Sequence, residues 1–331
     1  MSRKRSTPWA WIIGSIICLF FIGIIGLTFI GAVVGGSVKS DHVALVNFYG
    51  EISDQEGGKL FGARGSRDFI ADLDAARTDK SIKAVVLRIN SPGGSAAASQ
   101  ELYQAIRRLR VEKPVVCSMG DAAASGGYYM AAACTKIYAN PATLTGSIGV
   151  ISQFMNVQSL LKKLGIQSDT FKSGKFKDAG SPFRQLRPDE RQLFQAMISD
   201  IYQQFVRDVV DGRKAATKGK LTQAELLKVA DGRVLTGRQA KQKMLIDELG
   251  GLYEAVAEAG KLGGIQGKPK VRSISGGSGL GGLVGSEAST PASGISALAQ
   301  SVGSSFALGF TKTFLHEVRE DASTPAMPQT R

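Results

Sequence analysis

Two apolar strand-like runs, each ending in a glycine-rich turn and followed by a helical pattern, limit the folds open to this chain. The run Lys83–Asn90 has Ala-Val-Val-Leu at its centre, ends at the turn 91–94 (Ser-Pro-Gly-Gly) and precedes a helical pattern over 95–110. Pro114–Met119 predicts a second buried strand, and Gly120–Ala133 predicts a turn that opens into a helix of small residues. Strands that alternate with helices predict an α/β domain with a largely parallel sheet.

Shorter elements are expected on either side of this pair. The predicted additional strands are Val43–Tyr49, Lys136–Ala139, Ile148–Ser152 and Ser168–Lys172, and the predicted helices are Ser66–Arg77 and Pro188–Asp211. Gly212 is placed as the stop of the second helix. Capping boxes that begin at Thr222 and Thr236 predict two more short helices.

The long helix carries an apolar residue at every fourth position. This stripe indicates core or subunit packing rather than a cofactor site, and it consists of Leu193, Met197, Ile201, Phe205 and Val209.

The N-terminal segment predicts a membrane anchor. From Trp9 to Val34 about 26 residues pass without a charge, which at ~1.5 Å per residue is long enough to cross a bilayer core. A cleaved signal peptide is the rival interpretation, but its apolar region is normally only ~7–15 residues. The basic residues at 3–5 keep the N-terminus in the cytoplasm by the positive-inside rule, so everything after Lys39 is expected on the exported side. The predicted domains are 1–40 (N-terminus and anchor), 41–266 (catalytic domain) and 267–331 (Gly/Ser-rich linker and tail).

Composition narrows the chemistry. The three cysteines form no C-x-x-C pair and the two histidines stand in no motif, so neither a metal site nor a histidine-based triad is expected. No cofactor is required. The net charge of +13 is dispersed and no nucleic-acid-binding motif accompanies it, which favours a membrane surface over nucleic acid. Cys117 and Cys134 are interpreted as two buried thiols, although pairing stays open in an oxidising compartment.

The two glycine turns are the candidate site. The carboxyl ends of parallel strands are where ligands gather, and the amides of Gly93 and Gly94 are open to close approach by a carbonyl oxygen. Ser125 begins a helix, where a developing alkoxide is favoured. The plainer alternative is that both runs are tight turns and that Ser125 is an ordinary N-cap.

Five ordered motifs, spread over roughly residues 43–260, resemble the bacterial signal peptide peptidase family (SppA, short form). They are Arg-Ile-Asn-Ser-Pro-Gly-Gly at 88–94, Ala-Ala-Ser-Gly-Gly-Tyr-Tyr at 123–129, Thr-Gly-Ser-Ile-Gly-Val at 145–150, Lys-Ser-Gly-Lys-Phe-Lys-Asp at 172–178 and Ala-Asp-Gly-Arg-Val-Leu-Thr-Gly at 230–237. The resemblance implies a Clp protease/crotonase-like fold of repeated strand–strand–helix units.

The same resemblance implies roles for individual residues. Ser125 is the nucleophile, Lys177 rather than Lys175 is the general base, Ser147 orients the lysine amine, and Gly93 with Gly94 forms the oxyanion hole. The implied substrates are cleaved signal peptides left in the membrane, and the implied assembly is a ring- or dome-like homo-oligomer. The implied location is the bacterial inner membrane, with a single pass and the catalytic domain outside.

Physical chemistry supports a lysine base. A lysine has a reference pKa near ~10.4, so acting as a base near neutral pH needs a fall of about three units, which burial away from acids supplies. Asp178 is therefore an awkward neighbour of Lys177, and its side chain is expected to point away. A solvated basic loop is the competing interpretation of this cluster.

Two other functions remain open at this point. A crotonase-like acyl-CoA enzyme shares the expected fold, and a catalytically silent membrane scaffold shares the expected anchor. Neither of them needs Ser125.

Overall fold

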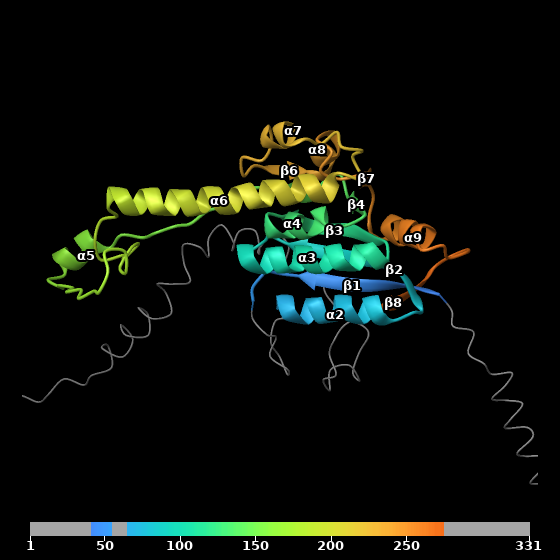
Figure 1. Cartoon of the computed structure of the whole chain (residues 1–331), viewed down its shortest axis with the longest axis horizontal. Coiled ribbons are helices and arrows are strands. Elements are labelled where there is room, and N and C mark those ends of the chain that lie inside the picture. The colour runs from blue at the N-terminus through green and yellow to red at the C-terminus, as the bar shows by residue number, and fades with distance from the viewer. Residues whose placement is uncertain (1–40, 55–64, 275–331) are drawn as a thin grey trace, which may run out of the picture. The chain divides into compact units, whose positions relative to one another are not determined.

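The structure is a computed structural model that describes residues 41–54 and 65–274 (Figure 1). Its centre is a sheet with the strand order β6-β5-β3-β2-β1-β8, and β4 pairs with β3 and β7. Every strand pair is parallel except β5 with β6. The predicted α/β class with a largely parallel sheet is therefore confirmed. The strands are β1 (His42–Tyr49), β2 (Ile82–Ser91), β3 (Val115–Ala124), β4 (Lys136–Ala139), β5 (Leu144–Gly146), β6 (Val234–Thr236), β7 (Glu248–Leu249) and β8 (Lys270–Ser273).

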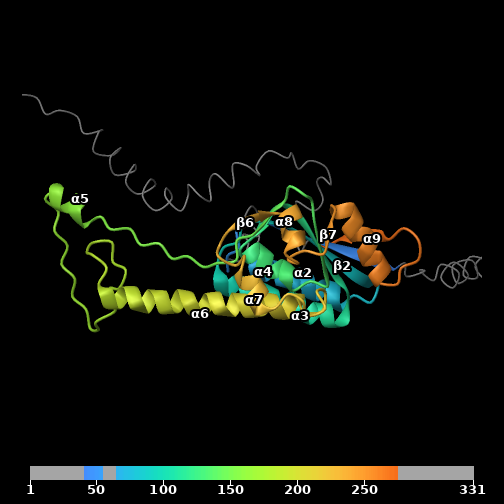
Figure 2. The ribbon, with the colours of Figure 1, turned by 90° about the horizontal axis from the view of Figure 1, so that it is seen from above.

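Helices cover both faces of this sheet. They are α2 (Ser66–Thr78), α3 (Ala96–Glu112), α4 (Gly126–Ala132), α5 (Gln158–Lys163), α6 (Pro188–Arg213), α7 (Gln223–Leu227), α8 (Gly237–Gln242) and α9 (Leu252–Leu262). The larger core joins one face of the sheet to residues such as Phe69 of α2, Leu102 of α3 and Tyr128 of α4. A smaller core joins the other face to Ala255 and Ala259 of α9. Figure 2 shows α9 on the side of the sheet away from α3.

Strand β3 is longer than the predicted strand, Pro114–Met119. It continues through Gly120 to Ala124, where a turn was predicted, because Gly120 lacks the side chain that would collide with Asn90. The Asn90 amide oxygen accepts a hydrogen bond from Ala122 N–H at 3.0 Å. This extension carries Ser125 to the edge of the sheet.

Two predicted strands are wrong. Residues 148–152 and 168–172 form no strand, and the short strand after β4 is instead β5, Leu144–Gly146, which pairs with the end of β3. After Ile148 the chain leaves the sheet, and Ile151 is 82% exposed, so apolar character there does not reflect burial within this chain. The segment also contains a short helix, α5, that the sequence did not indicate.

Gly212 does not end the long helix. α6 runs on to Arg213, so Gly212 lies inside the helix. The position requires glycine because a Cβ there would press on the carbonyl of Ala132. Its missing side chain lets α6 pack directly on the end of α4.

The predicted start of the linker at 267 is also too early. Lys270–Ser273 form β8, which pairs with β1 in parallel, and Arg272 binds Asp79 at 2.5 Å. The rest of the predicted linker and tail lies outside the described residues.

The predicted buried thiols are confirmed, since Cys117 and Cys134 are both buried and unpaired. Burial raises the pKa of the Cys117 thiol well above its usual value. Cys117 lies on β3 within the larger core, where the two thiols act as small apolar groups.

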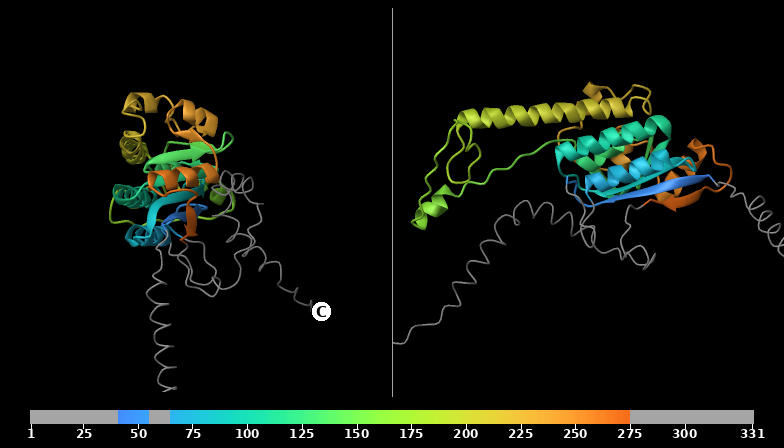
Figure 3. Two further views of the ribbon diagram at one scale, coloured as in Figure 1. Left: turned by 90° about the vertical axis from the view of Figure 1, so that its right-hand side faces the viewer. Right: turned by 60° about the horizontal axis from the view of Figure 1, so that its bottom comes forward.

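Residues 151–187 form an arm at the N-terminal end of α6. In Figures 1 and 3 α6 runs out from the sheet, and the arm with α5 lies at its far end. The apolar stripe of α6 divides accordingly. Phe205 and Val209 are buried against the body, whereas Leu193 and Met197 are exposed.

Within residues 41–54 and 65–274, no helix has the length and apolar content needed to cross a bilayer. The predicted span Trp9–Val34 lies outside the described residues.

Candidate active site

Ser125 sits in a strained turn between β3 and α4. Its φ of 51° and ψ of −118° are unusual for a residue with a side chain. Its N–H donates to Gly146 O at 2.9 Å and its own carbonyl accepts from Tyr129 N–H at 2.9 Å, so both sides of the turn are fixed. The Ser125 side chain makes no capping hydrogen bond to the helix. The plain N-cap interpretation therefore fails, and the half-buried hydroxyl is left for another use.

Ser147 is brought to the same edge of the sheet. β5 pairs with β3 so that Gly146 stands beside Ala124, and Ser147 and Ser125 follow these two paired residues. Ser147 also has a φ of 51°, and its N–H donates to Arg233 O at 2.8 Å. Ser125 and Ser147 thus follow the ends of two adjacent strands, and both have a positive φ.

The 91–94 turn packs directly against Ser125. A Cβ on Gly93, which has a φ of 107°, would lie 2.8 Å from the Ser125 Cβ and 2.8 Å from Gly126 N. Gly94 is equally restricted, because a side chain there would enter the backbone of Ile52. Gly93 therefore packs against Ser125, and Gly94 follows it in the same turn.

The amides of this turn differ in availability. Gly93 N–H donates to the buried Ser91 Oγ at 3.1 Å. Gly94 N–H has no acceptor within the part of the chain that the structure describes. Gly94 is thus the freer of the two predicted donors.

Sequence reasoning missed a third amide, that of Gly126. It directly follows Ser125, lies beside Gly93, and has no acceptor among the described residues, as expected for the first N–H of a helix. A side chain at Gly126 would press on the Ser99 hydroxyl, so the position requires glycine. The Ser-Gly-Gly motif carried this signal, since the residue after a nucleophile at a strand–helix turn commonly supplies an oxyanion donor.

Lys177 is not brought to Ser125 within the chain. It is exposed and belongs to the arm, in a turn closed by its own N–H donating to Gly174 O at 3.1 Å. Lys175 ties this turn to the start of α6, because its amine binds Asp189 at 2.7 Å and its carbonyl accepts from Arg187 at 2.8 Å. α4, by contrast, packs on the C-terminal half of α6.

The contact between α4 and α6 is specific. Phe205 of α6 stacks on Tyr129 of α4 with ring centroids 4.3 Å apart, and the Tyr129 hydroxyl donates to Asp208. Tyr103 donates to the Asp208 carbonyl at 2.7 Å. The Tyr129 contacts hold α6 against α4, the helix that follows Ser125, and the Tyr103 bond holds it against α3.

Asp178 is engaged by other cations. Its carboxylate binds Lys172 at 2.6 Å and Arg184 at 2.8 Å, and these partners hold the pKa of the carboxyl well below its usual range. Among the described residues, Lys177 makes no ion pair. This arrangement matches the prediction that the Asp178 side chain points away from Lys177.

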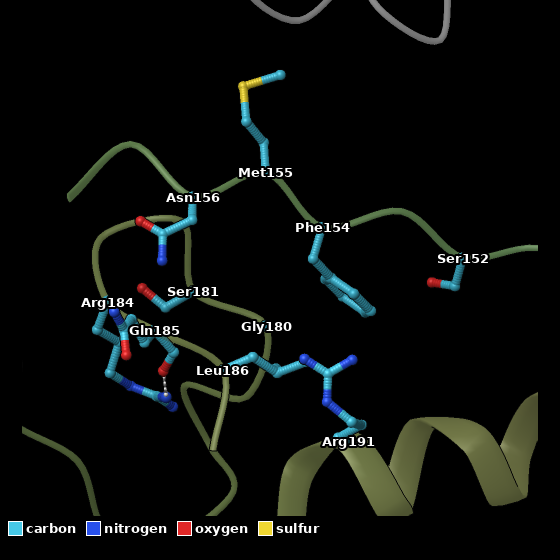
Figure 4. Close-up of a pocket in the computed structure, with 10 residues that line it drawn as sticks. All are labelled: Ser152, Phe154, Met155, Asn156, Gly180, Ser181, Arg184, Gln185, Leu186 and Arg191. Atoms are coloured by element: carbon cyan, nitrogen blue, oxygen red, sulfur yellow. Dashed lines mark hydrogen bonds between the residues drawn. The ribbon is translucent and has the colours of Figure 1, made fainter. Parts of the chain in front are cut away.

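A cavity of about 480 Å³ lies in the arm rather than beside Ser125 (Figure 4). Phe154 and Asn156 line it from the segment that leads out to α5, and Ser181 and Arg184 line it from the segment that returns to α6. Figure 4 shows the Met155 side chain directed away from the other residues. None of the predicted catalytic residues lines this cavity.

Comparison with known proteins identifies the family. The model of peptidase family S49 matches residues 107–266, and the Clp protease model matches residues 61–146. A Synechocystis sp. protein whose name describes it as a candidate protease is 40% identical over 66% of this chain and 82% of its own length. The chain belongs to peptidase family S49. It is therefore a serine peptidase with a Clp protease-like α/β fold, and the acyl-CoA enzyme loses its support.

Other relatives in this family are longer. The chloroplastic serine protease SPPA of Arabidopsis thaliana is 36% identical over 82% of this chain but only 38% of its own length. Protease 4 of Salmonella typhi is 38% identical over 66% of this chain and 34% of its own length. Similarity to these two proteins thus covers about a third of each.

Proposed function

We propose that this peptidase cleaves peptide bonds with a Ser125–Lys177 dyad in which the lysine comes from a neighbouring copy of the chain. The observation that carries the proposal is the Ser125 side chain, which makes no capping bond in a strained turn that packs against Gly93 and stands beside the strand end that leads to Ser147. A serine nucleophile needs a base, and among the described residues the only histidine, His42, begins β1 at the opposite end of the sheet.

The geometry of α6 argues for a neighbouring copy. Phe205, which packs on α4, is 17 residues after Pro188 in the same helix, so the start of α6 lies roughly 25 Å from that contact at ~1.5 Å per residue. Lys177 is held near the start of α6 by the Lys175 contacts. An amine carried so far from its own serine is placed to reach the serine of another copy.

Exposed apolar side chains on the arm support such an assembly. Phe171 is 98% exposed, and exposed apolar side chains in such number favour a surface that another protein covers. The other exposed large apolar residues of the arm are Ile151, Phe154, Met155, Leu160, Leu164, Ile166, Phe176 and Phe183, and Leu193 and Met197 of α6 are exposed as well. The proposed partner is a second copy of this chain.

The proposed reaction follows from these positions. The uncharged Lys177 amine accepts the Ser125 hydroxyl proton as Oγ attacks the peptide carbonyl carbon, and the Gly94 and Gly126 N–H groups donate to the oxyanion. Lys177 then gives the proton to the leaving amine, and an acyl-enzyme remains on Ser125. Lys177 then takes a proton from water, the hydroxide attacks the acyl carbon, and the lysine returns the proton to Ser125 Oγ as the acid leaves. Ser147 accepts a hydrogen bond from the amine and orients it.

We further propose that residues 9–34 anchor the enzyme in the membrane and that its substrates are signal peptides left there after cleavage. The uncharged N-terminal stretch supports the anchor, and the name of an Enterococcus faecium relative, which describes it as a candidate signal peptide peptidase SppA, supports the substrate. Exported placement of the catalytic domain follows from the charges at 3–5.

The test combines a probe with a substrate. The full chain in detergent is expected to react with a fluorophosphonate at Ser125 and to degrade a synthetic signal peptide, and Ser125→Ala is expected to lose both. Ser118→Ala is the matched control, because this buried serine on β3 lies away from the site. Equal peptide degradation by wild type and Ser125→Ala would refute Ser125 as the nucleophile.

A further inference from the structure

The sheet edge where the strands begin carries unpaired lysines. We call it the strand-start edge; His42 and Lys270 pair there as first residues of β1 and β8, and Ile82 stands beside His42 as the first residue of β2. Four exposed lysines lie at this edge or in the segments that lead to it. They are Lys80 before β2, Lys261 at the end of α9, and Lys268 and Lys270 at the start of β8.

These lysines come from both faces of the sheet but share one end of the fold. Lys80 follows α2, whereas α9 packs on the opposite face. The end of α9 reaches the same edge, because Gly263 packs against Lys83. In Figure 1 the ends of α2 and α9 lie at the same side of the sheet.

The carboxylates nearby already have partners. Asp41 binds Lys83 at 3.4 Å, Glu258 binds Lys136 at 2.9 Å, and Arg272 binds Asp79. Arg77 binds both Asp74 and Glu112. Lys80, Lys261, Lys268 and Lys270 make no ion pair with described residues, so their charges are in excess at this edge.

Two apolar side chains accompany the lysines. Val111, at the end of α3, is 88% exposed, and Leu262, the last residue of α9, is 40% exposed. Exposed apolar side chains among lysines are typical of surfaces that rest on lipid headgroups.

We propose that the strand-start edge docks on the anionic headgroups of the membrane that holds the anchor, a proposal that rests on the proposed N-terminal span. The span ends at Val34 and β1 begins at His42, so the seven residues 35–41 limit the separation to about 25 Å. A tether of this length leaves the strand-start edge within reach of the headgroups. Clustered lysines at that distance are attracted by anionic lipid, and the attraction falls with salt.

Docking fixes the height of the active site. Ser125 lies at the other end of the strands, and β1 alone, with 8 residues at ~3.3 Å each, is about 26 Å long. A docked domain holds the nucleophile about one strand length above the headgroups, so a substrate must leave the bilayer to be cleaved.

Lysine acylation of the full chain in vesicles tests the docking. In phosphatidylcholine vesicles that contain phosphatidylglycerol, acylation of the four edge lysines should slow severalfold relative to phosphatidylcholine alone, and high salt should restore it. Lys162 and Lys163 on α5 are internal controls and should not respond. Equal rates in both lipids, or equal slowing at Lys162 and Lys163, would overturn the proposal.

A matched pair of variants separates docking from anchor and catalysis. Lys261→Gln/Lys268→Gln should weaken the lipid-dependent slowing at Lys80 and Lys270, whereas Lys162→Gln/Lys163→Gln should not. Flotation with neutral vesicles reports the anchor, and fluorophosphonate labelling in detergent reports Ser125. A chain that floats with neutral vesicles and is labelled at Ser125, but whose edge lysines are acylated equally fast in both lipids, would refute docking and leave the anchor and the nucleophile standing. A chain that fails to float with neutral vesicles would refute the anchor, and binding to phosphatidylglycerol vesicles would then measure docking directly.

Discussion

Co-expression of two inactive variants tests the shared active site. Ser125→Ala removes the nucleophile and keeps the arm, whereas Lys177→Ala removes the proposed base and keeps the nucleophile. If Ser125 and Lys177 of one chain worked together, every chain in a mixed assembly would lack one of them. The roughly 25 Å from the start of α6 to its contact with α4 predicts instead that each site draws on two chains.

The expected magnitude follows from random mixing. In an equal mixture, half of the sites have an intact Ser125, and half of those face an intact Lys177, so about one quarter of the wild-type specific activity should return. Each variant assembled alone should retain almost none. The assay is hydrolysis of a fluorogenic signal peptide, with total enzyme fixed and the variant ratio varied. Activity should rise and fall with the product of the two fractions and peak at the equal mixture.

Two controls make the mixing experiment decisive. Ser125→Ala mixed with the double variant Ser125→Ala/Lys177→Ala should stay inactive at every ratio. Lys175→Ala alone should keep part of its activity, because Ser125 and Lys177 both remain and only the ion pair between Lys175 and Asp189 is lost. No recovered activity in a mixture proven by mass spectrometry to contain both variants in one assembly would refute the shared site.

Further predictions concern the packing of α6, the orientation of the lysine amine and the response of the arm to low pH. Gly212→Ala should cost about 1–3 kcal/mol of unfolding free energy, because its methyl would press on the Ala132 carbonyl, and chemical denaturation measures this loss. Ser147→Ala should lower kcat about tenfold to a hundredfold with an unchanged thermal midpoint, since alanine is no more strained than serine at a φ of 51°. The amine of Lys175 holds the pKa of Asp189 at about 2, below its ordinary 3.8. A carboxyl with a lowered pKa stabilises the fold above its ordinary pKa, so the protection factors of the amide hydrogens at 174–178 should fall only as pH drops from about 4 toward 2. Constant protection factors across that window would contradict the ion pair.

The core of the fold was predictable because its periodicity is strong. Buried strands β2 and β3 and the helices after them follow from apolar runs and turn residues whose neighbours lie nearby in sequence. The end of β3 was not predictable in this way. Gly120 reads as a turn, and only its packing against Asn90, from another strand, keeps it in the sheet. β8 was missed because its four residues are exposed and gain their place only by pairing with β1.

The arm shows a different limit. The apolar residues at 148–152 predicted a strand, since a run of apolar residues usually reports burial within the same chain, and Phe171 is the one apolar residue of the other wrongly predicted strand, 168–172. Here the arm residues Ile151 and Phe171 are exposed, and the sequence alone does not state which chain covers an apolar residue. The glycines and serines of the site were predictable from motifs because backbone geometry requires them locally. The position of Lys177 was not, since it depends on where a 26-residue helix points.

The ion pairs of the arm keep carboxylates away from the Lys177 amine, which matters because Ser125 is not near it in the same chain. An amine delivered by a neighbour must arrive uncharged, and the carboxylates nearest to it in sequence would otherwise hold it as a cation. Asp178 is bound by Lys172 and Arg184, and Asp189 is bound by Lys175. The surplus of basic residues in the arm therefore neutralises the local acids and leaves one lysine over. On this argument the basic cluster is a means of keeping Lys177 free of carboxylates until it meets a serine.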